Sequence, residues 1–259
     1  MLMTLSDPRG RLIFKPLLAE RSMSVSPTSP TREVSMIDAR PEGADGGARK
    51  FFEGYARSFD HIYDDDGKSP LRRFVDMRLR KEMRLRFSKA FEVLAPMRGH
   101  SLLDAGCGGG RYAIPAAEAG ASHVLGLDFS ESMLDLARDR ARAVGVERVC
   151  EFTVGDLLTY PLPPKGFDYA LAIGFFDYQR DPAAALRALA RATRKRIFVS
   201  IPKRWHLLTP QRYIRYTFFR CYIRFYSRAE VENLARAVQA KRFTIFDHHR
   251  ELNLLIELE

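Results

Sequence analysis

Cysteine is scarce in this chain of 259 residues. The three cysteines, Cys107, Cys150 and Cys221, cannot all pair with one another, and no two of them have the C-x-x-C spacing of a zinc or redox motif. This excludes a disulfide scaffold, argues against a structural zinc site and favours a reducing compartment. We therefore expect a cytoplasmic protein with no metal site.

Long hydrophobic runs are also lacking. No stretch approaches about 18 uninterrupted apolar residues, and the first 20 residues carry charges that a signal segment would not tolerate. With 46% hydrophobic and 29% charged residues, the composition is that of an ordinary globular protein. The length suits one large α/β domain, and we expect no transmembrane segment.

Acidic residues are absent from one window, between Ala183 and Ala229, in which twelve arginines and lysines occur. Outside it, 30 basic residues are balanced by 32 acidic ones, so this window accounts for the whole net charge of +10. Such a concentration indicates an anionic partner: a carboxylate or phosphate substrate, a nucleic acid or an anionic membrane. A solvated basic face without a partner is the alternative.

The character of the chain changes twice along its length. Residues 1–48 are rich in Ser, Pro and Gly with little periodicity, which predicts a disordered or loosely attached leader. From 49 to 95, apolar residues recur every three to four positions, which predicts N-terminal cap helices that Pro96 ends. We expect these helices to belong to one domain, 49–259.

Beyond Pro96, short apolar runs alternate with amphipathic stretches, which predicts a mostly parallel sheet with helices on both faces. We expect strands at 101–105, 123–128, 150–154, 167–174 and 196–201, and helices near 111–119, 131–143 and 182–193. Two further apolar runs, 243–249 and 252–258, are separated by only a couple of residues. So short a link forces them to be antiparallel strands.

The most informative stretch is a strand that runs directly into glycines and then into a helix. Gly106, Gly108 and Gly110 let the backbone turn sharply and let a ligand approach without a Cβ in the way. The G-x-G-x-G spacing differs from the dinucleotide fingerprint, which requires a third glycine where Arg111 stands. Asp104, at the end of the strand, would repel a pyrophosphate and suit a cationic amino group. The loop therefore predicts a ligand with a positive end.

The run DAGCGGG, from Asp104 to Gly110, resembles motif I of the class I S-adenosylmethionine-dependent methyltransferases. Three more segments resemble that family in the same order: VLGLD, whose acidic residue binds the ribose; FSESML, which packs on the adenine; and GDL, whose carboxylate accepts the adenine amino group. The resemblance implies S-adenosylmethionine as the cofactor. It implies these cofactor-binding residues: Asp104, Gly106, Cys107, Gly108, Gly110, Asp128, Phe129, Met133, Asp156 and Leu157.

The resemblance covers about 51–259 and implies a doubly wound, Rossmann-like α/β fold. Its seven-stranded sheet would have the order 3-2-1-4-5-7-6, with strand 7 antiparallel and helices at the N-terminus. The prefix 51–63 resembles the lead-in of small-molecule members, namely ubiquinone-pathway and magnesium-protoporphyrin methyltransferases. This second resemblance suggests that Tyr55, Phe59 or Tyr63 caps the cofactor site, and Tyr55 and Tyr63 are expected to contact the substrate.

Methyl transfer is an in-line displacement, which needs alignment and exclusion of water rather than a metal or a covalent residue. A general base matters only for an acceptor that arrives protonated with a high pKa. The candidates are Asp177, Tyr178 and His206, although an exposed loop histidine is the simpler interpretation of His206. The catalytic residue is therefore left open.

The run after the fourth strand, Gly-Phe-Phe-Asp-Tyr, lacks the Asn/Asp-Pro-Pro-Tyr/Phe motif of adenine and glutamine amine methyltransferases. None of the cysteines follows a proline, as the nucleophile of cytosine-C5 enzymes does. These absences disfavour nucleobase methylation of those two kinds. A nucleic acid is therefore not the expected substrate.

The segment 202–228 is expected to form a lid insertion, and Tyr178 and Arg212 are expected to lie at the acceptor. If 210–226 is helical, apolar and arginine residues occupy opposite faces, which fits three hypotheses. The first is a lid over an anionic aromatic or isoprenoid small molecule, the second peripheral docking on a membrane, and the third an RNA-binding platform. A non-catalytic module that only binds S-adenosylmethionine is a further alternative, because no general base can be recognised.

Overall fold

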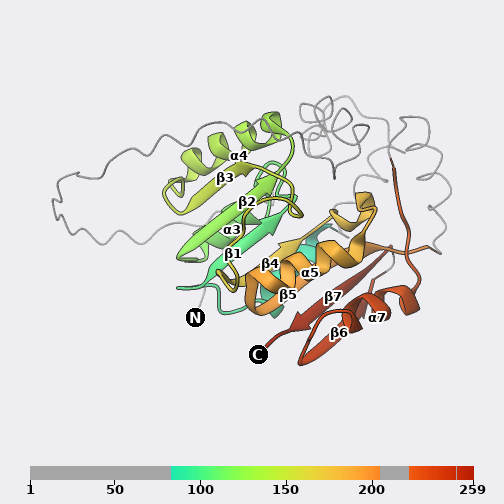
Figure 1. Ribbon diagram of the computed structural model, residues 1–259. Coiled ribbons are helices and arrows are strands. Elements are labelled where there is room, and N and C mark those ends of the chain that lie inside the picture. Colours follow the sequence, from blue (N-terminus) through green and yellow to red (C-terminus); the bar gives the residue numbers. More distant parts are fainter. Residues whose placement is uncertain (1–82, 205–221, 249) are drawn as a thin grey trace, which may run out of the picture. The chain divides into compact units, whose positions relative to one another are not determined.

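The computed structural model describes residues 83–204, 222–248 and 250–259 (Figure 1). The predicted leader, most of the predicted cap helices and the part of the predicted lid at 205–221 lie outside the described residues. Of the cap, residues 83–93 are helical and the chain leaves the helix before Pro96, as expected. No helix among the described residues is long and apolar enough to cross a membrane.

The described residues form a seven-stranded sheet in the order β3-β2-β1-β4-β5-β7-β6. All neighbouring pairs are parallel except those of β7, which is antiparallel to both β5 and β6. The predicted order and the reversed strand are confirmed. The strands are β1 (Ser101–Ala105), β2 (His123–Asp128), β3 (Cys150–Val154), β4 (Phe167–Ala172), β5 (Thr193–Pro202), β6 (Arg242–Asp247) and β7 (Glu251–Glu257).

Four strand predictions were wrong at their ends. The fourth strand stops at Ala172, because Gly174 turns the chain with a φ of +66°. The fifth begins at Thr193, directly after the preceding helix, so strand and helix share a boundary. Both strands of the last pair lie slightly earlier than expected, and the main chains of His248 and Glu251 exchange hydrogen bonds where the two strands meet.

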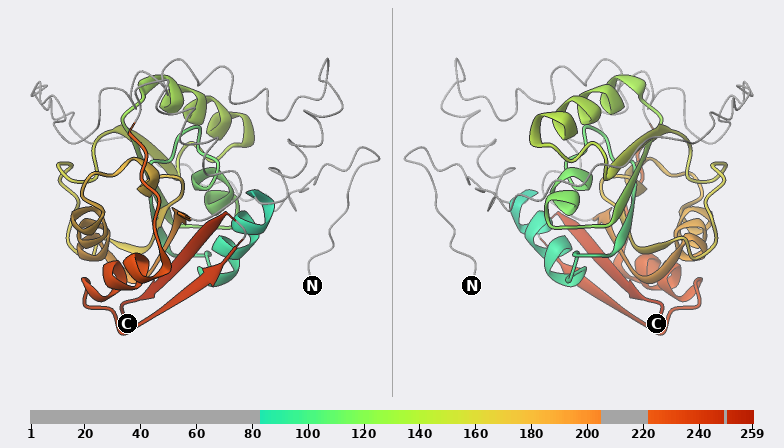
Figure 2. Two further views of the ribbon diagram at one scale, coloured as in Figure 1. Left: turned by 90° about the vertical axis from the view of Figure 1, so that its right-hand side faces the viewer. Right: turned by 90° about the vertical axis from the view of Figure 1, so that its left-hand side faces the viewer.

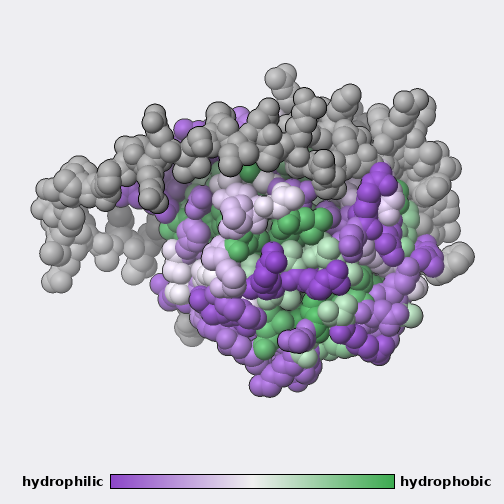
Figure 3. Space-filling model, viewed as in Figure 1, coloured by the Kyte–Doolittle hydropathy of each residue, from purple (hydrophilic) through white to green (hydrophobic). Residues whose placement is uncertain are grey.

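Helices cover both faces of the sheet, as Figure 2 shows. One face packs against α5 (Pro182–Ala192) and α7 (Arg228–Arg236). The other packs against the helix at 83–93, α3 (Ala113–Glu118) and α4 (Glu131–Val144). In Figure 3, hydrophobic side chains lie between polar ones over the region of α5 and α7. The central strands are therefore buried on both sides, which explains why they read as continuous apolar runs.

Short local signals start and end these helices. Asp181 accepts a hydrogen bond from the Ala184 amide and caps α5, whose first residue is Pro182. Ser227 and Glu230 form a reciprocal capping box at the start of α7. Gly145 ends α4 in the left-handed conformation. These caps place each helix end without help from distant residues.

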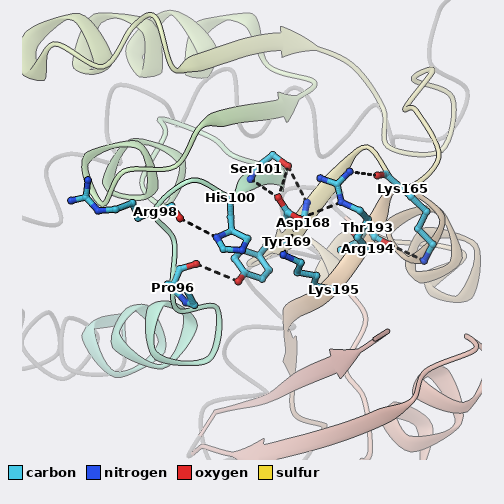
Figure 4. Close-up of polar contacts among 10 residues, drawn as sticks. All are labelled: Pro96, Arg98, His100, Ser101, Lys165, Asp168, Tyr169, Thr193, Arg194 and Lys195. Atoms are coloured by element: carbon cyan, nitrogen blue, oxygen red, sulfur yellow. Dashed lines mark hydrogen bonds and ion pairs between the residues drawn. The ribbon is translucent and has the colours of Figure 1, made fainter.

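The amino ends of β1, β4 and β5 are joined through one carboxylate, Asp168 (Figure 4). It accepts hydrogen bonds from the Ser101 amide at 3.0 Å and hydroxyl at 3.2 Å, and from Arg194 Nε at 3.2 Å, with Lys195 Nζ 3.3 Å away. Burial alone would raise the pKa of Asp168, but these donors hold it well below its ordinary value. The Asp168 carboxylate at the amino ends of these strands is thus paired within the fold.

We expect Asp168→Asn to lower the free energy of unfolding at pH 7 by about 1–3 kcal/mol, because it removes charged hydrogen bonds that join three strands. A lowered pKa in the folded state stabilises the fold above the ordinary carboxyl pKa, and this stabilisation is lost as the pH falls below it. Urea unfolding at pH 7 and pH 3 should therefore show a smaller difference at pH 3. The control is Asp135→Asn, at an exposed ion pair of α4. An equal loss in both variants would contradict this role.

Candidate functional site

The glycine loop leaves the carboxyl end of β1 and is tied to β2 through its backbone. The amides of Gly106 and Cys107 donate to the carbonyl of Leu127 at 2.7 and 3.0 Å. Gly108 and Gly110 have φ angles of +52° and +76°, which favour glycine. A Cβ at Gly110 would stand 2.8 Å from Ile114 Cδ1, so a side chain there would also clash with α3. The loop therefore holds a close turn with its backbone open to a ligand.

Asp104 lies beneath this loop and is fully buried. A backbone hydrogen bond from Ala113 favours its charged form, while its Oδ2 has no hydrogen-bond partner. Burial, and to a lesser extent the neighbouring charge of Asp128, raise the pKa of Asp104 to about 7. Such a carboxylate gains most from a cationic partner, which is the role the sequence predicts for it.

Asp128 ends β2, and its carboxylate is held by main-chain donors, among them those of Gly108 and Ser130. The Gly108 amide donates to Oδ2 and the Ser130 amide to Oδ1, both at 2.9 Å. Burial raises the pKa of Asp128, and these hydrogen bonds oppose the rise. The arrangement joins the glycine loop, the end of β2 and the start of α4 at one carboxylate. Its remaining lone pairs fit a pair of hydroxyl donors.

Fewer contacts define the part of the site that is predicted to hold the adenine. Met133 of α4 is buried, and its Cε would lie 3.1 Å from a Cβ at Gly108, so it reaches the loop. The Gly155 amide donates to the Asp128 carbonyl at 3.0 Å, which places the exit of β3 beside that of β2. Asp156 Oδ1 caps its own turn by accepting from the Leu158 amide. Phe129 is half-buried.

Two of the predicted residues have buried side chains with a packing role. Leu157 belongs to the apolar cluster on the α5 side of the sheet, so only its main chain is suited to a ligand contact. Cys107 is buried in the cluster on the opposite side, and its Sγ would lie 2.9 Å from a Cβ at Gly126. Burial raises the pKa of this thiol well above its ordinary value, which keeps it protonated.

Phe175 is a residue that the sequence analysis did not assign to the site. Its Cδ2 would lie 2.9 Å from a Cβ at Gly106, so the ring packs directly on the glycine loop. It also packs edge-on against the buried Phe176, with ring centroids 5.8 Å apart. The available signal was its position next to Gly174 in the run after the fourth strand. Sequence alone did not place that run over the first loop.

A segment from 222 to 226 crosses the carboxyl ends of β4 and β5. The Arg224 amide donates to the Asp177 carbonyl at 2.8 Å, and the Tyr226 amide donates to the Pro202 carbonyl at 2.9 Å. The Tyr226 hydroxyl donates to the Phe176 carbonyl at 3.0 Å. These contacts fix the short 3-10 turn η2 (Phe176–Tyr178) against the end of the sheet.

Of the base candidates, Asp177 is buried and Tyr178 half-buried, both in η2. The third candidate, His206, lies outside the described residues, as do the predicted substrate residues Tyr55, Tyr63 and Arg212. Within the described ranges, no group of three or more His, Cys, Asp or Glu residues is arranged to hold a metal ion.

Comparison with known proteins identifies related sequences and folds. Residues 102–196 match the family model described as "Methyltransferase domain". The 27-O-demethylrifamycin SV methyltransferase of Amycolatopsis mediterranei is 29% identical over 154 residues, which are 59% of this chain and 53% of that protein. The ubiquinone biosynthesis O-methyltransferase of Neisseria meningitidis is 37% identical over 99 residues, which are 37% of this chain and 40% of that protein. The chain thus spans about half, or less, of the length of these relatives.

The fold also matches a solved structure along most of the chain. The magnesium protoporphyrin IX methyltransferase of Synechocystis, determined with bound SAH, aligns with a TM-score of 0.64 at 19% identity. The alignment covers 82% of this chain and 98% of that one. At this identity the similarity establishes the shared fold.

We expect the affinity for S-adenosylhomocysteine to rise about tenfold between pH 6 and pH 8, because the cofactor's ammonium group binds the ionised form of Asp104. Calorimetric titration across this range, in buffers of different ionisation enthalpy, would measure both the affinity and the proton released. Asp104→Asn should bind more weakly and lose the pH dependence. A wild-type affinity that is flat with pH would show that Asp104 does not face the ammonium group.

We expect Asp128→Ala to raise the Kd for S-adenosylhomocysteine by about 10- to 100-fold, because charge-assisted hydrogen bonds contribute roughly 1.5–3 kcal/mol each. Calorimetry at pH 8 measures the change. Asp139→Ala, at an exposed ion pair of α4, is the control and should bind like the wild type. An unchanged affinity in Asp128→Ala would place the ribose elsewhere.

Proposed function

We propose that this chain, which carries a class I S-adenosylmethionine-dependent methyltransferase domain, methylates a small-molecule acceptor that is anionic and aromatic or isoprenoid. The observation that supports the cofactor most directly is the Asp128 carboxylate, held by the Gly108 and Ser130 amides near Asp104, whose Oδ2 has no hydrogen-bond partner. This donor and acceptor set fits a ligand with paired hydroxyls and a cationic end. Such a ligand is S-adenosylmethionine.

The bound cofactor supplies an activated methyl group on a sulfonium, and displacement by the acceptor's nucleophile leaves S-adenosylhomocysteine. The chain's own contribution is to align the two and to keep water away. Phe175, packed on Gly106, supplies an apolar wall between the loop and η2. Asp177 and Tyr178 are the proposed candidates for taking a proton from the acceptor, since both lie at the exit of β4.

The acceptor side carries aromatic rings paired with arginines. The guanidinium of Arg180 lies 4.9 Å from the centroid of the Tyr222 ring, and that of Arg224 lies 5.0 Å from the Tyr226 ring. These pairs come from η2's exit and from the segment 222–226. The Arg180–Tyr222 pair supports an acceptor that offers an aromatic or extended apolar body together with negative charge, whereas Tyr226 is buried in the core and holds the segment in place. The names of the rifamycin and ubiquinone relatives also point to small molecules.

The domain organisation is part of the same proposal. Residues 1–48 would form a leader, 49–95 a helical cap and 202–228 a lid over the acceptor. A cytoplasmic location is supported by the free, buried thiols of Cys107 and Cys150. Docking of 210–226 on a membrane or on RNA is the alternative use of its charge.

Incubation with S-adenosylmethionine and a panel of catechols, hydroquinones and carboxylated phenols should yield S-adenosylhomocysteine in proportion to a methylated product. We expect the rate to change less than about twofold between 50 and 300 mM salt, because a free small substrate makes few ionic contacts. An RNA substrate would instead lose binding by orders of magnitude over such a range. Tight binding of S-adenosylhomocysteine without product on any acceptor would favour a non-catalytic module.

A further inference from the structure

Buried polar atoms without a hydrogen-bond partner lie at one end of the strands. Among the described residues these atoms are Asp104 Oδ2, His248 Nε2 and both amide atoms of Asn253. Asp104 is near the carboxyl end of β1, His248 follows β6 and Asn253 lies near the start of the antiparallel β7. All therefore lie toward the carboxyl ends of the parallel strands, where sheets of this type bind ligands. The cofactor accounts for Asp104 and leaves Asn253 unexplained.

The register of the sheet fixes where Asn253 points. It stands opposite Ser200 of β5 and Phe246 of β6. Its neighbours Leu252 and Leu254 pack on the α5 side, so the Asn253 side chain points to the other face. The helix at 83–93 covers that face.

Two contacts of that helix bracket the position of Asn253. Lys89 Nζ lies 5.1 Å from the centroid of the Phe246 ring, beside Asn253 in the sheet. Arg86 donates to both carboxylate oxygens of Glu251, two residues before Asn253, at 2.8 and 2.9 Å. Asn253 thus lies on the face that this helix covers, beside the strand residues that Arg86 and Lys89 contact.

Ser200 offers a second donor beside the Asn253 amide. It is buried, and its hydroxyl oxygen accepts from the Gly174 amide at 2.9 Å, which leaves the hydroxyl proton to donate. Directly opposed residues on paired strands have Cβ atoms about 5 Å apart, so one ligand oxygen can reach both groups. Together they present three donor hydrogens and one unpartnered amide oxygen, Asn253 Oδ1. A carbonyl or carboxylate oxygen of the ligand satisfies the donors, and a hydroxyl or N–H group of the same ligand has to meet Oδ1.

An unpartnered amide at this position is costly to the fold. A buried amide without hydrogen bonds loses its interactions with water and gains nothing in return. On the same face of β7 the next residue is the buried Leu255, so an apolar side chain of similar size would fit the packing without that cost. Its presence is explained if it acquires a partner when the protein acts.

We propose that Asn253, together with Ser200, determines acceptor specificity by donating hydrogen bonds to a carbonyl or carboxylate oxygen at the acceptor's far end. With strands about 4.8 Å apart, Ser200 and Asn253 lie roughly 10 and 14 Å across the sheet from the glycine loop on β1. The acceptor is therefore longer than a single ring. This inference rests on the proposed methyl transfer and names the feature by which that site selects its substrate.

The test compares acceptor pairs that differ only in the distal carboxylate, such as 3,4-dihydroxycinnamate and 4-vinylcatechol, by formation of S-adenosylhomocysteine. The wild type should prefer the carboxylated member. Asn253→Leu should lose about tenfold in kcat/KM for that member, through KM, and be unchanged for the other. Asn253→Ser, which keeps one donor, should retain part of the preference. Thr244→Val on β6 is the matched control for a polar-to-apolar change in the same sheet.

Two measurements separate this inference from the proposed function and from a structural role. S-adenosylhomocysteine binding should be equal in all variants, and its absence in the wild type would contradict methyl transfer itself. The Tm of Asn253→Leu should be equal or higher, because an unpartnered amide is removed, and a fall of several degrees would show that the amide serves the fold. The specificity role would be overturned if the wild type showed no preference for the carboxylated acceptor, or if Asn253→Leu kept that preference unchanged. Cofactor binding without turnover of any acceptor pair would overturn it as well.

Discussion

The backbone tie between the glycine loop and β2 is the constraint on which the site depends. The carbonyl of Leu127 accepts from two loop amides, and the next residue, Asp128, accepts from a third at Gly108. The donors are main-chain groups, so the tie persists as long as the loop can turn at positive φ, which its glycines allow. One turn therefore both opens the backbone to a ligand and positions the carboxylate beside it.

Buried carboxylates at the two ends of the strands differ in their hydrogen-bond partners. At the amino ends, Asp168 is surrounded by donors from β1 and β5, which lower its pKa and join the strands. At the carboxyl ends, Asp104 keeps an unpartnered oxygen and a raised pKa. The amino ends thus hold a carboxylate that is paired within the fold, while the carboxyl ends hold polar atoms without a partner among the described residues.

The sequence predicted the strand positions through local signals and the sheet order through the family resemblance, whereas its cofactor-binding residues stay a prediction. Strands that are buried on both faces read as apolar runs, and Asp104, Gly108 and Asp128 stand at fixed intervals around a loop. The packing of Phe175 on Gly106 and the bond from Tyr226 to the Phe176 carbonyl join segments far apart in the chain. No local pattern encodes such contacts, since they arise only when the exit of β4 meets its neighbours.

Asp104 and Asn253 differ in how each can lower the free-energy cost of being buried. A carboxyl group can take up a proton, and the pKa of about 7 shows that Asp104 does so near neutral pH when it has no cation. An amide has no such alternative, so the cost of burying Asn253 without partners is the same at every pH. The neutral residue is therefore the stronger sign of a missing partner. The proposed partner brings an oxygen for the amide N–H groups and the Ser200 hydroxyl, and a donor for Asn253 Oδ1.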